Sequence, residues 1–110
     1  MERLIEDLRL ASYTNKAPIW KDLAVRLARP NRHVAEINLS RLSRIAKKGE
    51  VVVVPGKVLG SGELDKELSI AAVKASKTAR SKIAKAGGRL MDLAELVAEN
   101  PKGSGVRIVE

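Results

Sequence analysis

Glycines and a lysine directly follow an apolar run in the middle of the chain, and this combination suits phosphate binding. The run covers residues 51–54, and the segment 55–64 after it contains Gly56, Lys57, Gly60 and Gly62. Glycine adopts backbone angles that other residues avoid, so main-chain N–H groups in such a segment can turn outward and approach a phosphate closely. A tight strand-to-strand connection, in which the glycines serve only the backbone, explains the same residues, and the two roles are compatible.

A second segment of the same chemistry lies at 100–107, where glycines again alternate with cations. It contains Lys102, Gly103, Gly105 and Arg107. The apolar residues Val106, Ile108 and Val109 predict that this segment packs against the fold and is not a disordered tail. Two segments of one chemistry indicate a single large polyanion as the partner.

The charge of the chain supports a polyanionic partner. Lysine and arginine total 21 against 13 carboxylates, which gives a formal net charge of +8 and a pI of about 10.1. Residues 26–48 hold seven cations and one carboxylate, Glu36, and residues 74–89 hold six cations and no carboxylate. Solvated helix faces are the simpler explanation, but such faces usually interleave both signs. The sequence therefore predicts binding to nucleic acid through phosphate contacts.

The chain lacks the residues that catalysis and metal binding usually need. The chain has no cysteine and one histidine, His33, so zinc and thiolate sites are not expected and no cofactor is predicted. The segment 55–64 lacks the Gly-Lys-Ser/Thr triplet of a nucleotide-binding P-loop, and no serine stands out as a nucleophile. Glu63, Asp65 and Glu67 alternate, which predicts a solvent-facing strand edge in preference to a metal site. We therefore predict that the protein is not an enzyme and has no small-molecule substrate.

Membrane binding and base stacking also find little support. No apolar stretch approaches the roughly 20 residues needed to cross a bilayer, and residues 1–8 mix carboxylates into an amphipathic pattern unlike a secretory leader. We expect a cytoplasmic protein without a membrane partner. The only aromatic residues are Tyr13 and Trp20, so stacking on bases is not expected to be the main mode of recognition. Trp20 is interpreted as a core anchor.

Hydrophobic periodicity predicts an α/β fold, a small single domain with a short central β-sheet flanked by helices. Helices are expected at 2–12, 18–28, 38–48, 76–86 and 92–100. Strands are expected at 51–54, 68–73 and 106–109, and the first two of these should pair. The single domain 1–110 then has a helical N-terminal part, 1–49, and an α/β part, 50–110.

Five segments of the chain resemble a known family in their order and spacing. They are 17–20, 36–42, 52–64, 87–88 and 100–108. Through them the chain closely resembles the archaeal and eukaryotic "eighteen-e" family of large-subunit ribosomal proteins, over nearly its whole length, and its shortness resembles the archaeal members. Residues 57–88 are also similar to the carboxy-terminal part of the universal "fifteen" family, with which that group shares a fold.

The resemblance implies a structural protein of the large ribosomal subunit that binds large-subunit ribosomal RNA, has neighbouring ribosomal proteins as partners, and performs no catalysis. It also implies that the basic segment around Arg29, Arg32 and His33 and the glycine-rich stretches face RNA. A free-standing DNA- or nucleoid-binding protein is the alternative, although neither a dimer interface nor a recognition helix is evident. Together, charge and resemblance predict RNA contacts from Arg26, Arg29, Arg32, His33, Arg41, Arg44, Lys57, Gly60, Gly62, Lys77, Arg80, Lys82, Lys102, Gly103, Gly105 and Arg107.

Overall fold

The computed structural model describes residues 2–28 and 35–109. Contacts among these residues divide the chain into two compact units, which are described one at a time. Among the described residues, unit 1 holds those up to 28 together with 94–104, and unit 2 holds 35–93 and 105–109.

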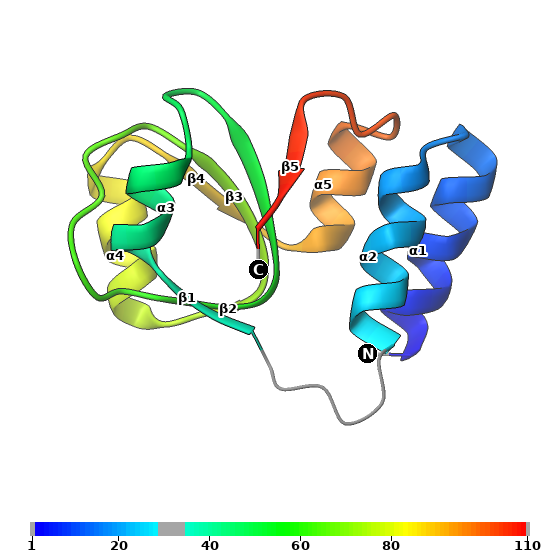
Figure 1. Cartoon of the computed structure of the whole chain (residues 1–110), viewed down its shortest axis with the longest axis horizontal. Helices are drawn as coiled ribbons and strands as arrows, with labels where there is room; N and C mark the ends of the chain where they lie inside the picture. The colour runs from blue at the N-terminus through cyan, green and yellow to red at the C-terminus, as the bar shows by residue number, and fades with distance from the viewer. Residues whose placement is uncertain (1, 29–34, 110) are drawn as a thin grey trace. The chain divides into compact units, whose positions relative to one another are not determined.

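Unit 1 is built on two neighbouring helices, α1 (Glu2–Asn15) and α2 (Pro18–Ala28), shown in blue and cyan in Figure 1. Lys16 ends α1 with a left-handed φ of 53°, and Pro18 opens α2, where its missing N–H costs no helical hydrogen bond. Trp20 is fully buried, and its indole N–H donates a 2.7 Å hydrogen bond to the carbonyl oxygen of Pro101. The interpretation of Trp20 as a core anchor is confirmed. Residues of α5 (Leu93–Glu99) from 94 onward complete this unit.

Unit 2 contains a parallel sheet of five strands. They are β1 (Ala35–Asn38), β2 (Val51–Leu59), β3 (Ser69–Ala75), β4 (Arg89–Met91) and β5 (Val106–Ile108). The order is β1-β2-β3-β4, and β5 also pairs with β2. Strand β5 pairs with residues 51–53 of β2, whereas β1 pairs with residues 56–59. The expected pairing of the two central strands is confirmed, and the α/β fold with a central sheet is confirmed with it.

Strand β2 extends five residues beyond its expected end at Val54. The sequence predicts that the glycine-rich loop begins at Pro55, but residues 55–59 continue the strand and the loop is 60–68. Pro55 lacks an N–H group and lies where the register with β3 shifts, between Val54 and Lys57, which is where a strand tolerates proline. Pairing with β1 holds this extension in place, and the local sequence gives no sign of that partner.

The strands β1 and β4 were not expected from the sequence. Strand β1 lies inside the part predicted to be helical, 1–49, and its Ile37 is buried. Strand β4 is three residues long and follows Gly88. Segments this short show no periodicity, so pairing with neighbouring strands determines their conformation.

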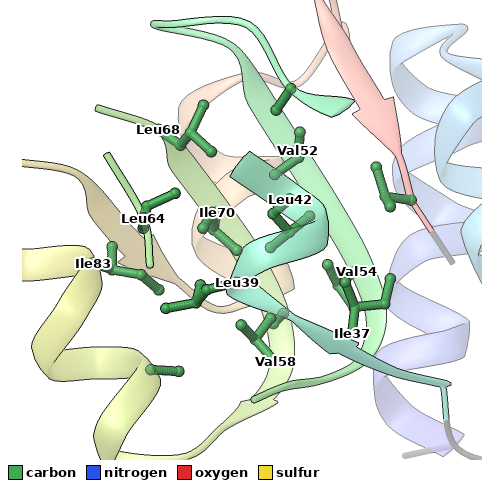
Figure 2. Close-up of a cluster of buried hydrophobic side chains, with 14 residues drawn as sticks. Ile37, Leu39, Leu42, Val52, Val54, Val58, Leu64, Leu68, Ile70 and Ile83 are labelled. Atoms are coloured by element: carbon green, nitrogen blue, oxygen red, sulfur yellow. The ribbon is translucent and has the colours of Figure 1, made fainter. Parts of the chain in front are cut away.

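The core of unit 2 lies between one face of the sheet and the helices α3 (Leu39–Ile45) and α4 (Lys77–Lys85). Figure 2 shows Leu39 and Leu42 of α3 and Ile83 of α4 pointing into this cluster, and Leu64 joins them from the loop. Leu64 is 8% exposed, so the loop is anchored to the core by its own side chain.

The predicted helices agree with the structure apart from their ends, and α3 stops at Ile45, short of the expected residue 48. The division into two units does not test the single-domain assignment, which stays a prediction. Within the residues described, no helix combines the length and hydrophobicity needed to span a bilayer.

Candidate nucleic-acid interface

Helices α3 and α4 both begin at the carboxyl edge of the sheet. Strand β1 leads directly into α3, and β3 leads through Ser76 into α4. The register aligns Asn38 with Leu59, so the ends of β1 and β2 lie at one level. The hydroxyl oxygen of Ser76 accepts a hydrogen bond of 3.1 Å from the Ala79 N–H and caps α4. Figure 1 shows the two helices on the same side of the sheet.

Exposed cations project from both helices. They are Arg41, Arg44, Lys77, Arg80 and Lys85. In the part of the chain that the structure describes, none of them forms an ion pair with a carboxylate. Neither helix has an acidic residue in its first turn. Four of these five cations, all except Lys85, are predicted contacts. The five side chains form one basic surface of unit 2, which we call the α3–α4 face.

The loop 60–68 runs from β2 to β3 past both helices. A Cβ on Gly60 would lie 2.6 Å from the Cβ of Thr78 in α4, and a Cβ on Gly62 would lie 2.4 Å from the Cβ of Ser40 in α3. Contacts this close require glycine for steric reasons. These glycines therefore serve the tight connection between the two strands, and their contact with phosphate stays a prediction.

Lys82 is attached to this loop and does not project freely into solvent. Its Nζ donates hydrogen bonds to the carbonyl oxygens of Gly60, at 2.8 Å, and Gly62, at 2.7 Å. The sequence predicts an RNA contact from Lys82, as from Lys77 and Arg80, but the Lys82 side chain is half-buried. It ties α4 to the loop, and its contact with RNA stays a prediction.

The loop also brings carboxylates to the two basic helices. Glu63, Asp65 and Glu67 are exposed, as expected, but they lie in a loop and the predicted strand is absent there. A charge count along the sequence therefore misses carboxylates near these cations, because the loop 60–68 brings them close to the helices only in the folded chain. The cations still outnumber the carboxylates, since α3 and α4 contain six lysines and arginines and no acidic residue.

Asp65 is fixed by a neighbour on α3. The Ser43 hydroxyl donates a hydrogen bond of 2.7 Å to its carboxylate, and this bond, helped by a backbone hydrogen bond and by the charge of Lys66, lowers the pKa of Asp65. Hydrogen bonds to the charged form favour ionisation. The lowered pKa stabilises the folded state above about pH 4, and this contribution is lost as the pH falls through the lowered value.

Replacing Ser43 with alanine should raise the pKa of Asp65 toward its usual range. The carboxyl carbon shift of Asp65, followed by NMR as a function of pH, measures this change. Ser81→Ala is a suitable control because Ser81 is exposed on α4 and makes no hydrogen bond with Asp65. An unchanged titration in Ser43→Ala would contradict the assigned cause.

Two further cations donate hydrogen bonds to carbonyl oxygens at the carboxyl-terminal end of α3. Lys66 donates from Nζ to the carbonyl oxygens of Ser43 and Ala46. Arg107 donates to the carbonyl oxygen of Ile45 at 2.9 Å and pairs with Glu50 at 3.2 Å. Cations suit this end of a helix because its last carbonyl groups carry partial negative charge. Arg107 therefore has an internal role, and its predicted RNA contact remains untested.

Lys57 lies in a cross-strand row at the same end of the sheet. The register aligns it with Glu36 on β1 and with Lys74 on β3. Like charges directly opposite each other on neighbouring strands repel, and a bound anion would remove that repulsion. Lys74 is not among the contacts predicted from the sequence, because its position beside Lys57 depends on the register of β2 and β3.

The remaining predicted contacts are more scattered. In unit 1, Arg26 pairs with Asp22 at 3.0 Å, Lys102 is exposed, and a Cβ on Gly103 would lie 2.4 Å from a methyl carbon of Ile19. In unit 2, Gly105 has an open environment and a φ of 72°. The predicted contacts Arg29, Arg32 and His33 lie outside the described residues. Among the residues that are described, no group of three histidine or carboxylate side chains is placed to hold a metal ion.

Comparison with known proteins identifies the relatives of this chain. The family described as ribosomal protein 60S L18 and 50S L18e matches residues 8–110. Large ribosomal subunit protein eL18 from Methanoregula boonei is 51% identical over 109 residues, covering 99% of this chain and 90% of the relative. The protein of that name from Archaeoglobus fulgidus is 53% identical over 106 residues, covering 96% and 91%. The one from Methanococcus maripaludis is 49% identical over 106 residues, covering 96% and 88%.

These matches confirm the resemblance that the sequence motifs indicated. They also confirm that the protein is not an enzyme, because the family consists of ribosomal proteins. The chain belongs to the family of ribosomal proteins 60S L18 and 50S L18e.

Proposed function

We propose that the protein is a structural constituent of the large ribosomal subunit that binds large-subunit ribosomal RNA through the α3–α4 face. Neighbouring ribosomal proteins are its further partners, and the cytoplasm is its location. The names of the relatives support the assignment to the subunit, and the charge and geometry of this face support the RNA contact.

The observation that carries the RNA contact is the placement of cations at the start of α4. Lys77 is the first residue of this nine-residue helix, Arg80 follows three residues later, and no carboxylate occupies the first turn. A helix N-terminus carries partial positive charge, so cations there destabilise the helix by about 0.3–1 kcal/mol each. Such an arrangement is expected where an anion occupies the site in the working complex.

The proposed mechanism uses phosphate contacts. Arg41 and Arg44 on α3 and Lys77 and Arg80 on α4 would neutralise RNA phosphates, while Lys82 keeps the loop 60–68 in a fixed position between them. Lys57 and Lys74 would bind a further phosphate at the end of the sheet. Phosphate contacts fix position and orientation but carry little sequence information, so RNA shape would select the binding site.

A binding experiment tests this proposal. The full chain is titrated onto in vitro transcribed large-subunit ribosomal RNA of Archaeoglobus fulgidus and, in parallel, onto duplex DNA of similar length, at several salt concentrations. We expect tighter binding to the RNA and an affinity that falls steeply with salt, because each neutralised phosphate releases counterions. Equal or tighter binding to the DNA would favour a nucleoid protein, and absence of RNA binding would reject the proposal.

A further inference from the structure

Tyr13 is far more exposed than an aromatic residue that serves only the core. Its exposed fraction is 86%, whereas Trp20, the other aromatic residue of the chain, is fully buried. Tyr13 lies on α1, and two other large apolar side chains of unit 1 are exposed, Leu10 at 64% and Val25 at 52%. Packing within the fold therefore leaves this ring available to a partner.

A hollow on unit 1 has Tyr13 as part of its wall. Residues of α1 and α2 line it, and its volume is about 390 Å³. The lining residues are Arg9, Ser12, Tyr13, Lys21 and Val25. Two of them are cations and none is a carboxylate. Arg9 also forms a long ion pair with Glu6, at 3.9 Å, in which both side chains are largely exposed, so Glu6 competes weakly for the guanidinium group.

We propose that this hollow receives one unstacked base of the ribosomal RNA, with the base lying on the ring of Tyr13. Lys21 and Arg9 would bind the adjoining phosphate, and the Ser12 hydroxyl offers a hydrogen bond to the edge of the base. This inference rests on the proposed function, because it assumes that the partner is RNA. It adds a contact on unit 1, separate from the α3–α4 face of unit 2.

Charge is the reason for assigning the hollow to RNA and not to a neighbouring protein. A hollow with two cations, no carboxylate and one exposed aromatic ring is complementary to a nucleotide, which combines a π-face with a negative phosphate. An apolar protein patch would complement Tyr13 and Val25 but would offer no anion to Lys21 and Arg9. Stacking on a single tyrosine is also compatible with recognition that otherwise depends on phosphate contacts.

A substitution series at Tyr13 tests the inference on the full chain, with the Archaeoglobus fulgidus large-subunit RNA transcript as the probe. Tyr13→Phe and Tyr13→Trp should bind within about two-fold of the parent, because both keep an aromatic face. Tyr13→Leu and Tyr13→Ala should bind about ten-fold more weakly, as expected from the loss of one stacked base. The dependence of affinity on salt should stay unchanged in Tyr13→Ala, whereas Lys21→Gln should reduce its slope by about one.

Leu10→Ala is the matched control, because Leu10 is exposed on the same helix and does not line the hollow. It should change the RNA affinity by less than two-fold. Circular dichroism of every variant should match the parent, since an exposed side chain contributes little to folding. Ultraviolet crosslinking of the parent complex should attach a nucleotide to the peptide that contains Tyr13.

The possible failures can be told apart. If Tyr13→Leu binds RNA as well as the parent does, the ring does not stack on a base and the inference is wrong, even though RNA binding itself stands. Loss of contact with a neighbouring ribosomal protein in Tyr13→Ala, with unchanged RNA affinity, would likewise overturn it and would assign the hollow to protein. If the parent chain does not bind the RNA at all, the proposed function fails together with this inference.

Discussion

Replacing Lys77 and Arg80 with glutamate in one variant is expected to weaken binding to large-subunit ribosomal RNA by about thirty-fold or more near physiological salt. Each phosphate contact contributes about 0.9 to the slope of log affinity against log salt, so the loss of two contacts should reduce that slope by about 1.8. Both side chains are exposed and form no ion pair among the described residues, so no internal contact is broken. Filter binding at several salt concentrations measures both quantities.

The same variant should be at least as stable as the parent protein. Both substitutions place a carboxylate in the first turn of α4, where the parent has none, and negative charge is favourable at a helix N-terminus by about 0.3–1 kcal/mol per group. Urea unfolding followed by circular dichroism measures the stability. Weaker RNA binding together with unchanged or higher stability would show that these cations serve binding at some cost in helix stability.

A variant with the same change in net charge at another place provides the control. Arg3 and Lys16 are exposed in unit 1, outside the α3–α4 face and outside the hollow at Tyr13. Their replacement by glutamate should reduce RNA affinity much less than the change at Lys77 and Arg80. Equal losses in the two variants would mean that net charge alone governs binding, and the assignment of the α3–α4 face would be wrong.

Replacing Gly62 with alanine is expected to lower the free energy of unfolding by about 3 kcal/mol, from two separate causes. Gly62 has a φ of 84°, which strains any residue with a Cβ, and its new Cβ would lie 2.4 Å from the Cβ of Ser40 and 3.2 Å from the Cα. Ser40 is the second residue of α3, so either the loop or the helix must move to make room for the new Cβ. The hydrogen bond from Lys82 to the carbonyl of Gly62 would be disturbed as well.

Gly49→Ala separates the two causes. Gly49 has almost the same backbone conformation, with a φ of 80°, but nothing lies within 4 Å of a Cβ built on it. Its replacement should cost only about 1 kcal/mol, from backbone strain. Chemical denaturation of both variants measures the difference. If Gly62→Ala is no more destabilised than Gly49→Ala, the loop yields freely and its contact with α3 contributes little to the fold.

The sequence predicts the helices of this protein well because their signals are local. The signals are the periodic apolar residues, Pro18 at the start of α2 and Ser76 before α4. Each of them determines structure within one or two turns of its own helix. The strands β1 and β4 carry no such signal, and they form because β2 and β3 offer edges with which to pair. The extension of β2 to Leu59 has the same origin.

The candidate site could be predicted in its chemistry but not in its arrangement. A count of lysines and arginines identifies Lys77 and Arg80, because these residues need only a helix to expose them. The position of Lys82 on the carbonyl oxygens of Gly60 and Gly62 joins residues about twenty positions apart, and periodicity within α4 contains no information about that contact. The return of Asp65 to α3 is hidden from the sequence for the same reason.

The pairing of β5 with β2 and the hydrogen bond from Trp20 to Pro101 have a consequence for biosynthesis. Each unit contains early residues with a partner beyond position 100, and that partner is synthesised after them. Until the segment 101–109 has emerged, one edge of β2 is exposed beside residues 51–53 and the indole N–H of Trp20 lacks its acceptor. Neither unit can therefore finish folding before that segment has emerged.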